Sequence, residues 1–180
     1  SNKDKPTIVK TRFVAQNQQL LRVDRENTYP VSDDVKKDIL NRAEEEIKDA
    51  SIMILSDYGK GLLTFDLIQS LIALATKYKI PILVDPKGND YTIYKGATII
   101  TPNRNELSQA TGGMETKTDN DVVMAAQKLI KGCNFDYVFA TRSEDGITVV
   151  PKTGEPTHLR TKSIEVYDVS GAGDTVVAVT

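Results

Sequence analysis

Residues 52–61 read IMILSDYGKG, in which four apolar residues are followed by a turn that carries two glycines. An apolar run of this length, bounded by turn residues, is typical of a strand buried on both faces of a parallel sheet. Residues 64–75 then place apolar side chains at helical spacing, and residues 80–84 and 97–101 form two further apolar runs. This alternation predicts parallel strands joined by crossover helices, which is the α/β fold class.

The segments before this unit extend the pattern toward the N-terminus. Residues 7–24 alternate β-forming side chains around a polar break, and they predict two extended strands. Residues 32–47 begin with a serine suited to an N-cap and two aspartates, followed by apolar residues at helical spacing. We therefore expect an amphipathic helix between the opening strands and the first α/β unit.

The segments after it contain two helix starts and a hairpin. Asn103 with Glu106 and Thr118 with Asp121 have the spacing of capping boxes, and the second opens a run of helical periodicity. Residues 137–150 hold two short apolar runs separated by the turn sequence EDG. That arrangement predicts a pair of antiparallel strands.

The composition excludes several classes of function. The 180 residues include 23 basic and 25 acidic side chains, interspersed along the chain, so a net charge of -2 gives no electrostatic reason to expect nucleic acid or an anionic membrane as a partner. One cysteine, Cys133, and one histidine, His158, exclude an internal disulfide framework and a Cys/His zinc cluster. No apolar stretch approaches the roughly 18 to 20 residues that span a bilayer. We expect a cytoplasmic chain whose partners are small molecules.

Residues 168–175 read DVSGAGDT and carry the strongest chemical signal. Their two glycines let the backbone approach a ligand closely, and a helix beginning there would direct unpaired N–H groups toward an anion such as phosphate. A carboxylate at Asp174 suits a group that accepts a proton from an attacking hydroxyl. The short pattern Gly-x-Gly-Asp also fits a plain glycine turn before an acidic first helical turn.

The complete octet resembles the C-terminal signature of the ribokinase-like (PfkB) carbohydrate kinases. The resemblance implies an ATP-dependent transfer of a phosphoryl group to a sugar hydroxyl. Gly171, Ala172 and Gly173 would form the anion hole for that group, and Asp174 would be the catalytic base.

The same resemblance implies the architecture of the whole chain. It predicts a ribokinase-like three-layer α/β/α sandwich with a mostly parallel sheet, in which residues 7–24 form a small β lid and residues 32–180 the core. The family's N-terminal sugar-contacting motif, and the segments that follow the signature helix, have no counterpart in the 180 residues. We expect a partial kinase domain, incomplete at both ends and inactive by itself.

Residues 101–106, which read TPNRNE, resemble the family's Pro-Asn-x-x-Glu motif. By this resemblance the motif binds ATP through Asn103, Arg104, Asn105 and Glu106. Asn103 and Glu106 would also organise Mg²⁺ through water. A helix cap without further function is the alternative, and the two roles can coexist.

Thr141 and Arg142 follow a buried strand and resemble the nucleotide-side turn of the family. The resemblance implies that both face the ATP phosphates, where an arginine neutralises the charge that develops on the bridging oxygen. An exposed arginine in an ordinary hairpin turn is the alternative.

Five segments in the right order narrow the resemblance further, namely residues 10–12, 18–24, 56–61, 85–88 and 165–174. Together they resemble the kinase module of enzymes that phosphorylate D-glycero-β-D-manno-heptose 7-phosphate, on the route to ADP-heptose and lipopolysaccharide. Such modules are often fused to an adenylyltransferase. A phosphorylated substrate needs fixed cations, and our candidates are Lys60 and Lys87 in the core with Arg12 and Arg22 in the lid. Solvated surface charges are the alternative.

Two other functions remain open at this point. Another PfkB kinase, acting on a different sugar phosphate, ribose, fructose or a nucleoside, fits the same motifs. A structural module of a different class, associating as a homodimer through the lid strands, fits the two opening strands. Stabilisation by Mg-ADP would distinguish a kinase from such a module.

Overall fold

The computed structural model describes residues 7–16 and 18–160, whose strands form two sheets. A hairpin of β1 (Val9–Ala15) and β2 (Gln18–Arg25) is antiparallel, and a second sheet has the strand order β3-β4-β5-β6-β7-β8. The second sheet contains β3 (Met53–Ser56), β4 (Ile82–Asp85), β5 (Ile99–Ile100), β6 (Tyr137–Thr141), β7 (Ile147–Pro151) and β8 (Thr157–Leu159). Strands β3 to β6 are parallel, and β7 and β8 are antiparallel to their neighbours. The expected mostly parallel sheet is confirmed.

The helices are α1 (Asp33–Glu46), α2 (Phe65–Tyr78), α3 (Arg104–Ala110) and α4 (Asp119–Cys133), with short 3-10 segments η1 (Ile47–Asp49), η2 (Tyr91–Tyr94) and η3 (Ser143–Asp145). Both expected capping boxes are formed, with Asn103 and Thr118 as the N-caps of α3 and α4. Ser32 is the N-cap of α1, although its side chain makes no capping hydrogen bond. Local sequence therefore determines where these helices begin.

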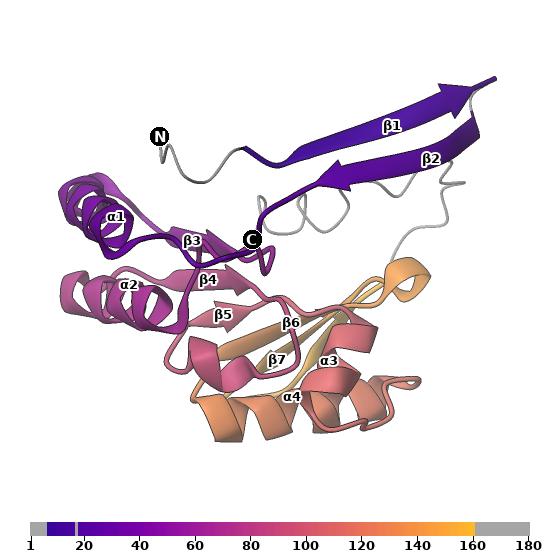
Figure 1. Cartoon of the computed structure of the whole chain (residues 1–180). Coiled ribbons are helices and arrows are strands. Elements are labelled where there is room, and N and C mark those ends of the chain that lie inside the picture. The colour runs from indigo at the N-terminus through magenta and orange to yellow at the C-terminus, as the bar shows by residue number, and fades with distance from the viewer. Residues whose placement is uncertain (1–6, 17, 161–180) are drawn as a thin grey trace.

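One face of the six-stranded sheet builds the hydrophobic core. A row of aligned side chains crosses five strands, and all are buried: Leu55, Val84, Ile100, Val138 and Val150. They belong to one buried cluster with side chains of α2 and α4. Figure 1 shows these two helices beside the sheet. Because β3 to β6 are adjacent in chain order, right-handed crossovers place the connecting helices on this same face.

The opposite face of the sheet is more open among the described residues. Of its aligned residues, Ile54 is 45% exposed and Tyr137 is 42% exposed, whereas Leu83 between them is fully buried. The expectation that residues 52–55 form a strand buried on both faces is therefore wrong for Ile54. β3 is one of the two edge strands of the described sheet, and the described helices pack on the face that Leu55 occupies.

Two expected strands differ in their bounds. β4 begins two residues later than expected, because Lys79 ends α2 in the left-handed conformation and the Ile80 N–H still donates to Ala75. β5 has two residues instead of the five expected, since only Ile99 and Ile100 pair with both neighbouring strands. The order of elements is unaffected.

The β1–β2 hairpin extends away from the core, as Figure 1 shows. Its two strands confirm the expectation for residues 7–24, with a register shift between Phe13 and Val14. The chain returns from β2 through residues 26–31, where the Val31 N–H donates to the Gly61 carbonyl at 2.9 Å. None of the helices in the described part of the chain is long and apolar enough to cross a membrane.

Candidate active site

The carboxyl ends of β3 to β6 meet along one edge of the sheet, and the predicted site residues follow these ends. The Asp57 N–H donates to the Asp85 carbonyl at 2.9 Å, which joins the turns after β3 and β4. Asn103 forms a β-bridge with Thr141, and the Thr141 N–H donates to the Pro102 carbonyl at 2.9 Å. In open α/β sheets this edge is where ligands bind.

The turns after β3 and β4 carry the two lysines that we expected to bind a substrate phosphate. Lys60 Nζ lies 2.6 Å from Glu26 Oε1, and Lys87 Nζ lies 3.6 Å from Glu106 Oε1. The Lys60 side chain is 30% exposed and the Lys87 side chain 57% exposed. Both ammonium groups therefore lie at the expected edge of the sheet, each next to a glutamate.

Tyr94 connects these two turns, and the sequence analysis assigned it no role. Its hydroxyl lies 2.6 Å from Asp57 Oδ2 and accepts a hydrogen bond from the Lys87 N–H at 3.1 Å. Asp57 Oδ1 accepts a second hydrogen bond from the Gly59 N–H at 2.7 Å. Tyr94 lies in a 3-10 turn with no hydrophobic periodicity, so the sequence offered no signal for this contact.

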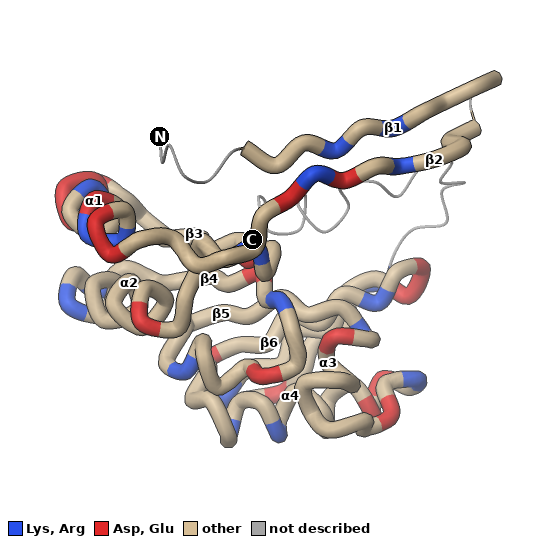
Figure 2. Tube along the Cα trace, in the orientation of Figure 1, with Lys and Arg blue, Asp and Glu red and all other residues tan. Residues whose placement is uncertain are grey.

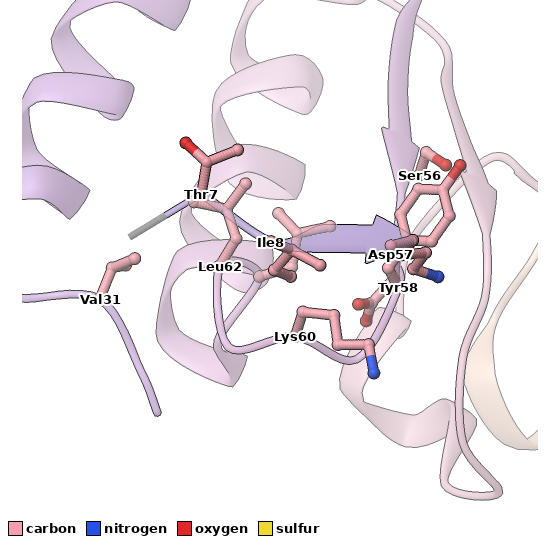
Figure 3. Close-up of a pocket in the computed structure, with 10 residues that line it drawn as sticks. Thr7, Ile8, Val31, Ser56, Asp57, Tyr58, Lys60 and Leu62 are labelled. Atoms are coloured by element: carbon pink, nitrogen blue, oxygen red, sulfur yellow. The ribbon is translucent and has the colours of Figure 1, made fainter. Parts of the chain in front are cut away.

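A cavity of about 580 Å³ lies between the start of β1 and the end of β3 (Figure 3). Its lining is formed by Thr7, Ile8, Lys10, Val31, Ser56, Asp57, Tyr58, Lys60, Leu62 and Leu63. This volume is in the range of small-molecule pockets, which combine apolar walls with a few fixed polar groups. The lining includes Lys10 from the lid and Lys60 from the core, and Lys10 was not among the predicted site residues.

Arg12 and Arg22 face each other across the hairpin, because they are aligned in the register of β1 and β2. Alternation along β1 places Arg12 on the same side as Lys10, and Figure 2 shows the basic residues along both strands. Arg22 Nε lies 3.0 Å from Asp24 Oδ1. The described structure brings Lys10 to the cavity, but it does not place Arg12 or Arg22 in its lining.

The predicted nucleotide motif at residues 103–106 is formed as a reciprocal cap. Asn103 Oδ1 accepts from the Glu106 N–H, and Glu106 Oε2 accepts from the Asn103 N–H, both at 3.0 Å. Asn105 is exposed, while Arg104 is half-buried and paired with Asp145. The capping role is thus confirmed, and the ATP-binding role of these residues remains a prediction.

The described residues fit a water-mediated Mg²⁺ site better than direct coordination. No group of three or more His, Cys, Asp or Glu side chains in the described ranges could hold a metal ion. Glu106 Oε2 is used by the cap, while Glu106 Oε1 faces Lys87. Mg²⁺ usually keeps several of its waters, so Asn103 and Glu106 can bind those waters without releasing the cap.

Arg142 lies inside the fold. Its side chain is 2% exposed, and Nη1 lies 2.6 Å from Asp119 Oδ1 and 3.0 Å from Thr148 Oγ1. The hydrogen bond from Arg142 is the main reason why the pKa of the Asp119 carboxyl is lowered. The alternative of an exposed hairpin arginine is therefore wrong, and the contact of Arg142 with the ATP phosphates remains a prediction.

The remaining predicted site residues lie outside the described part of the chain. These are the anion-hole residues Gly171, Ala172 and Gly173, and the proposed base Asp174. Thr141, by contrast, is placed at the carboxyl end of β6 beside Asn103.

Curated proteins with similar sequences share one description. The bifunctional protein HldE of Paramagnetospirillum magneticum is 51% identical over 172 residues, which cover 96% of this chain and 35% of that protein. The bifunctional protein HldE of Rhodospirillum rubrum is 49% identical over 172 residues, covering 96% of this chain and 34% of that protein. The chain spans about a third of the length of these relatives.

Solved structures share the fold at lower sequence identity. Phosphofructokinase-2 from Escherichia coli, in complex with potassium, has a TM-score of 0.78 at 20% identity, covering 96% of this chain and 55% of that chain. Arabidopsis thaliana ribokinase, complexed with ribose and ATP, has a TM-score of 0.68 at 21% identity, covering 97% of this chain and 55% of that chain. The ribokinase-like fold is thereby confirmed.

The family model described as pfkB family carbohydrate kinase matches residues 1–180, and the chain belongs to this family.

Proposed function

We propose that the protein containing this chain transfers the γ-phosphoryl group of ATP to a sugar that already carries a phosphate. The observation that carries this proposal is the placement of Lys60 and Lys87 on adjacent turns at the ligand-binding edge of the sheet. Two ammonium groups at this edge suit a doubly charged phosphate ester better than an uncharged sugar. The family of the chain supplies the reaction type.

The substrate that we propose is D-glycero-β-D-manno-heptose 7-phosphate, phosphorylated at its anomeric hydroxyl to give the 1,7-bisphosphate. This choice rests on the sequence motifs that resemble kinase modules of ADP-heptose and lipopolysaccharide biosynthesis. The similar curated proteins are described as bifunctional, which agrees with a kinase module joined to a second activity.

Each group has a part in the proposed reaction. Lys60 and Lys87 hold the phosphate that the sugar already carries, and this fixes its hydroxyl toward ATP. Asp174 accepts the proton of the sugar hydroxyl, whose oxygen forms a bond to the γ-phosphorus while the bond to the bridging oxygen breaks and ADP leaves. The backbone N–H groups of residues 171–173 stabilise the phosphoryl group during this transfer. Bound Mg²⁺, held through water by Asn103 and Glu106, would neutralise charge on the ATP phosphates.

The lid hairpin supports a homodimer as part of the same proposal. Val9, Phe13, Leu21 and Val23 lie on one side of the hairpin by its register, and each is at least 50% exposed. The side that carries Lys10 faces the cavity, so the apolar side faces outward. An outward apolar surface on a soluble hairpin favours burial against a second copy. Light scattering should report a dimer that Phe13→Asp dissociates, and an unchanged mass would contradict this interface.

The reaction is tested by incubating the full-length protein with ATP and a panel of sugars and sugar phosphates. Phosphorus NMR of the products should show a new anomeric phosphate when heptose 7-phosphate is the acceptor. Transfer to a different acceptor would refute the proposed substrate, while the proposed kinase reaction would stand. Absence of transfer, together with no thermal stabilisation by Mg-ADP, would favour the structural module instead.

A further inference from the structure

The hydroxyl of Tyr94 links the turns that carry Lys60 and Lys87. The Lys87 N–H donates to the hydroxyl at 3.1 Å, and the hydroxyl donates to Asp57 Oδ2 at 2.6 Å. Asp57 Oδ1 then accepts from the Gly59 N–H, one residue before Lys60. A continuous chain of hydrogen bonds therefore joins the backbone of one lysine turn to the backbone of the other.

The core fixes the position of this hydroxyl, independently of the turns. Tyr94 is fully buried, and its ring packs edge-on against Tyr91 with a centroid distance of 5.9 Å. The Tyr94 carbonyl accepts from the Ala97 N–H at 3.0 Å, and the neighbouring Ile93 carbonyl accepts from Gln69 Nε2 at 2.8 Å. The 3-10 segment η2 is thus attached to α2 and to the chain entering β5.

The turns, in contrast, have conformations that depend on glycine. Gly59 has a φ of 63° and Gly88 a φ of 84°, so both use the left-handed region. Glycine reaches many conformations, so each turn needs outside contacts to hold one of them. The Tyr94 hydroxyl provides such a contact to both turns at once.

We propose that Tyr94 is a positioning residue that sets the separation between Lys60 and Lys87, so that both ammonium groups reach the phosphate of one sugar phosphate. This inference rests on the phosphate-binding role proposed for the two lysines. Tyr94 acts through the backbone of Lys87 and the carboxylate of Asp57, without touching the substrate. Its role predicts a larger effect on the sugar phosphate than on ATP, because the proposed ATP site lies at the turns after β5 and β6, whereas the Tyr94 hydroxyl contacts the turns after β3 and β4.

The Tyr94 hydroxyl keeps its proton in the neutral range. Burial, followed by the hydrogen bond to Asp57, raises the pKa of the Tyr94 hydroxyl above its usual value of 10.0. The hydroxyl therefore remains a donor there, with Asp57 Oδ2 at 2.6 Å and the Lys87 carbonyl at 3.2 Å as its two acceptors, one in each turn.

Tyr91 provides a matched control for removing the hydroxyl. It lies in the same 3-10 segment and is 2% exposed, and its hydroxyl has no hydrogen-bond partner among the described residues. In the full-length protein, Tyr94→Phe should raise the KM for the sugar phosphate about fivefold to tenfold, with kcat and the KM for ATP within twofold. Tyr91→Phe should leave all three values unchanged. Equal effects of the two substitutions, or an equal rise in both KM values, would overturn the proposal.

A double-mutant cycle separates positioning from general destabilisation. If Tyr94 acts through Lys87, adding Tyr94→Phe to Lys87→Met should raise the KM for the sugar phosphate by less than Tyr94→Phe does alone. Full multiplication of the two effects would show that they are independent and would contradict the mechanism.

Hydrogen exchange supplies a readout that does not need activity. The amides of Lys87 and Gly59 should exchange faster in Tyr94→Phe than in Tyr91→Phe, since the first loses its acceptor and the second depends on the orientation of Asp57. Unchanged exchange of both amides in Tyr94→Phe, in a full-length protein that phosphorylates the sugar phosphate normally, would refute the role of Tyr94 and leave the proposed function intact. Faster exchange, in a full-length protein that phosphorylates no sugar phosphate, would refute the proposed function and the substrate-positioning role with it.

Discussion

Replacing Lys60 by methionine should weaken binding of the sugar phosphate, because the substitution removes one of the two cations that we assign to its phosphate. A charge-assisted contact to phosphate contributes about 1.5 to 3 kcal/mol, and its loss corresponds to a rise in KM of roughly tenfold to more than a hundredfold. The KM for ATP should change little. Methionine keeps much of the apolar stem, so the packing around the turn is preserved.

Replacing Glu26, the partner of Lys60, should have the opposite effect on the KM for the sugar phosphate. In the described structure its Oε1 lies 2.6 Å from Lys60 Nζ, with side-chain exposures of 29% and 30%. A partly exposed ion pair of this kind contributes about 0.2 to 1 kcal/mol, which is less than a phosphate contact provides. The substrate phosphate should therefore displace Glu26, and Glu26→Gln should lower the KM for the sugar phosphate by up to about fivefold.

Steady-state kinetics of the full-length protein, with each substrate varied in turn, tests both substitutions. The reasoning requires shifts of opposite sign for Lys60→Met and Glu26→Gln, confined to the sugar phosphate. An equal rise in both KM values for Lys60→Met would indicate a structural lysine. A higher KM for the sugar phosphate in Glu26→Gln would show that Glu26 orients Lys60 and does not compete with the substrate.

Two further predictions concern the scaffold around the site. A Cβ added at Gly61, which has a φ of +76°, would lie 2.4 Å from a backbone carbonyl of the lid connection, whereas one added at Gly88, with a φ of +84°, meets nothing within 4 Å. In urea unfolding, Gly88→Ala should therefore lower the free energy of unfolding by about 1 to 2 kcal/mol. Gly61→Ala should lower it by about 1 to 3 kcal/mol more than Gly88→Ala does, and equal losses would contradict the close approach at Gly61. The hydrogen bond from Lys36 lowers the pKa of the Asp66 carboxyl from 3.8 to about 2. The charged carboxylate therefore stabilises the fold fully above pH 3.8, and this stabilisation is lost as the pH falls through about 2. A carbon NMR titration should show the Asp66 pKa returning toward 3.8 in Lys36→Met, and an unchanged value would refute the assigned cause.

Features determined by local sequence could be predicted. The capping boxes at Asn103 and Thr118 depend on residues three positions apart, and both are formed. The strand and helix order followed from periodicity, and the turns at Lys60 and Lys87 were expected at the edge where they lie. In these cases the deciding interactions are close in sequence, or follow from the geometry of parallel strands.

Features determined by distant partners could not be predicted. The buried Arg142 is paired with Asp119 and Thr148, which lie in α4 and β7. No local sequence pattern indicates that pairing, so the burial of Arg142 could not be predicted. Ile54 is exposed because of its place in the sheet, although its sequence context is that of a buried strand. The pairing of Lys60 with Glu26 likewise joins residues 34 positions apart, one in the lid connection and one in the core.

The most direct test of the central claim is the turnover of the full-length protein with Asp174 replaced by asparagine. The carboxamide has nearly the same shape as the carboxylate but cannot accept the hydroxyl proton as a base. We predict that calorimetry will show unchanged binding of ATP and the sugar phosphate, while turnover falls by roughly a hundredfold to ten-thousandfold. Turnover close to that of the unaltered protein would contradict Asp174 as the catalytic base and the phosphoryl-transfer mechanism built on it.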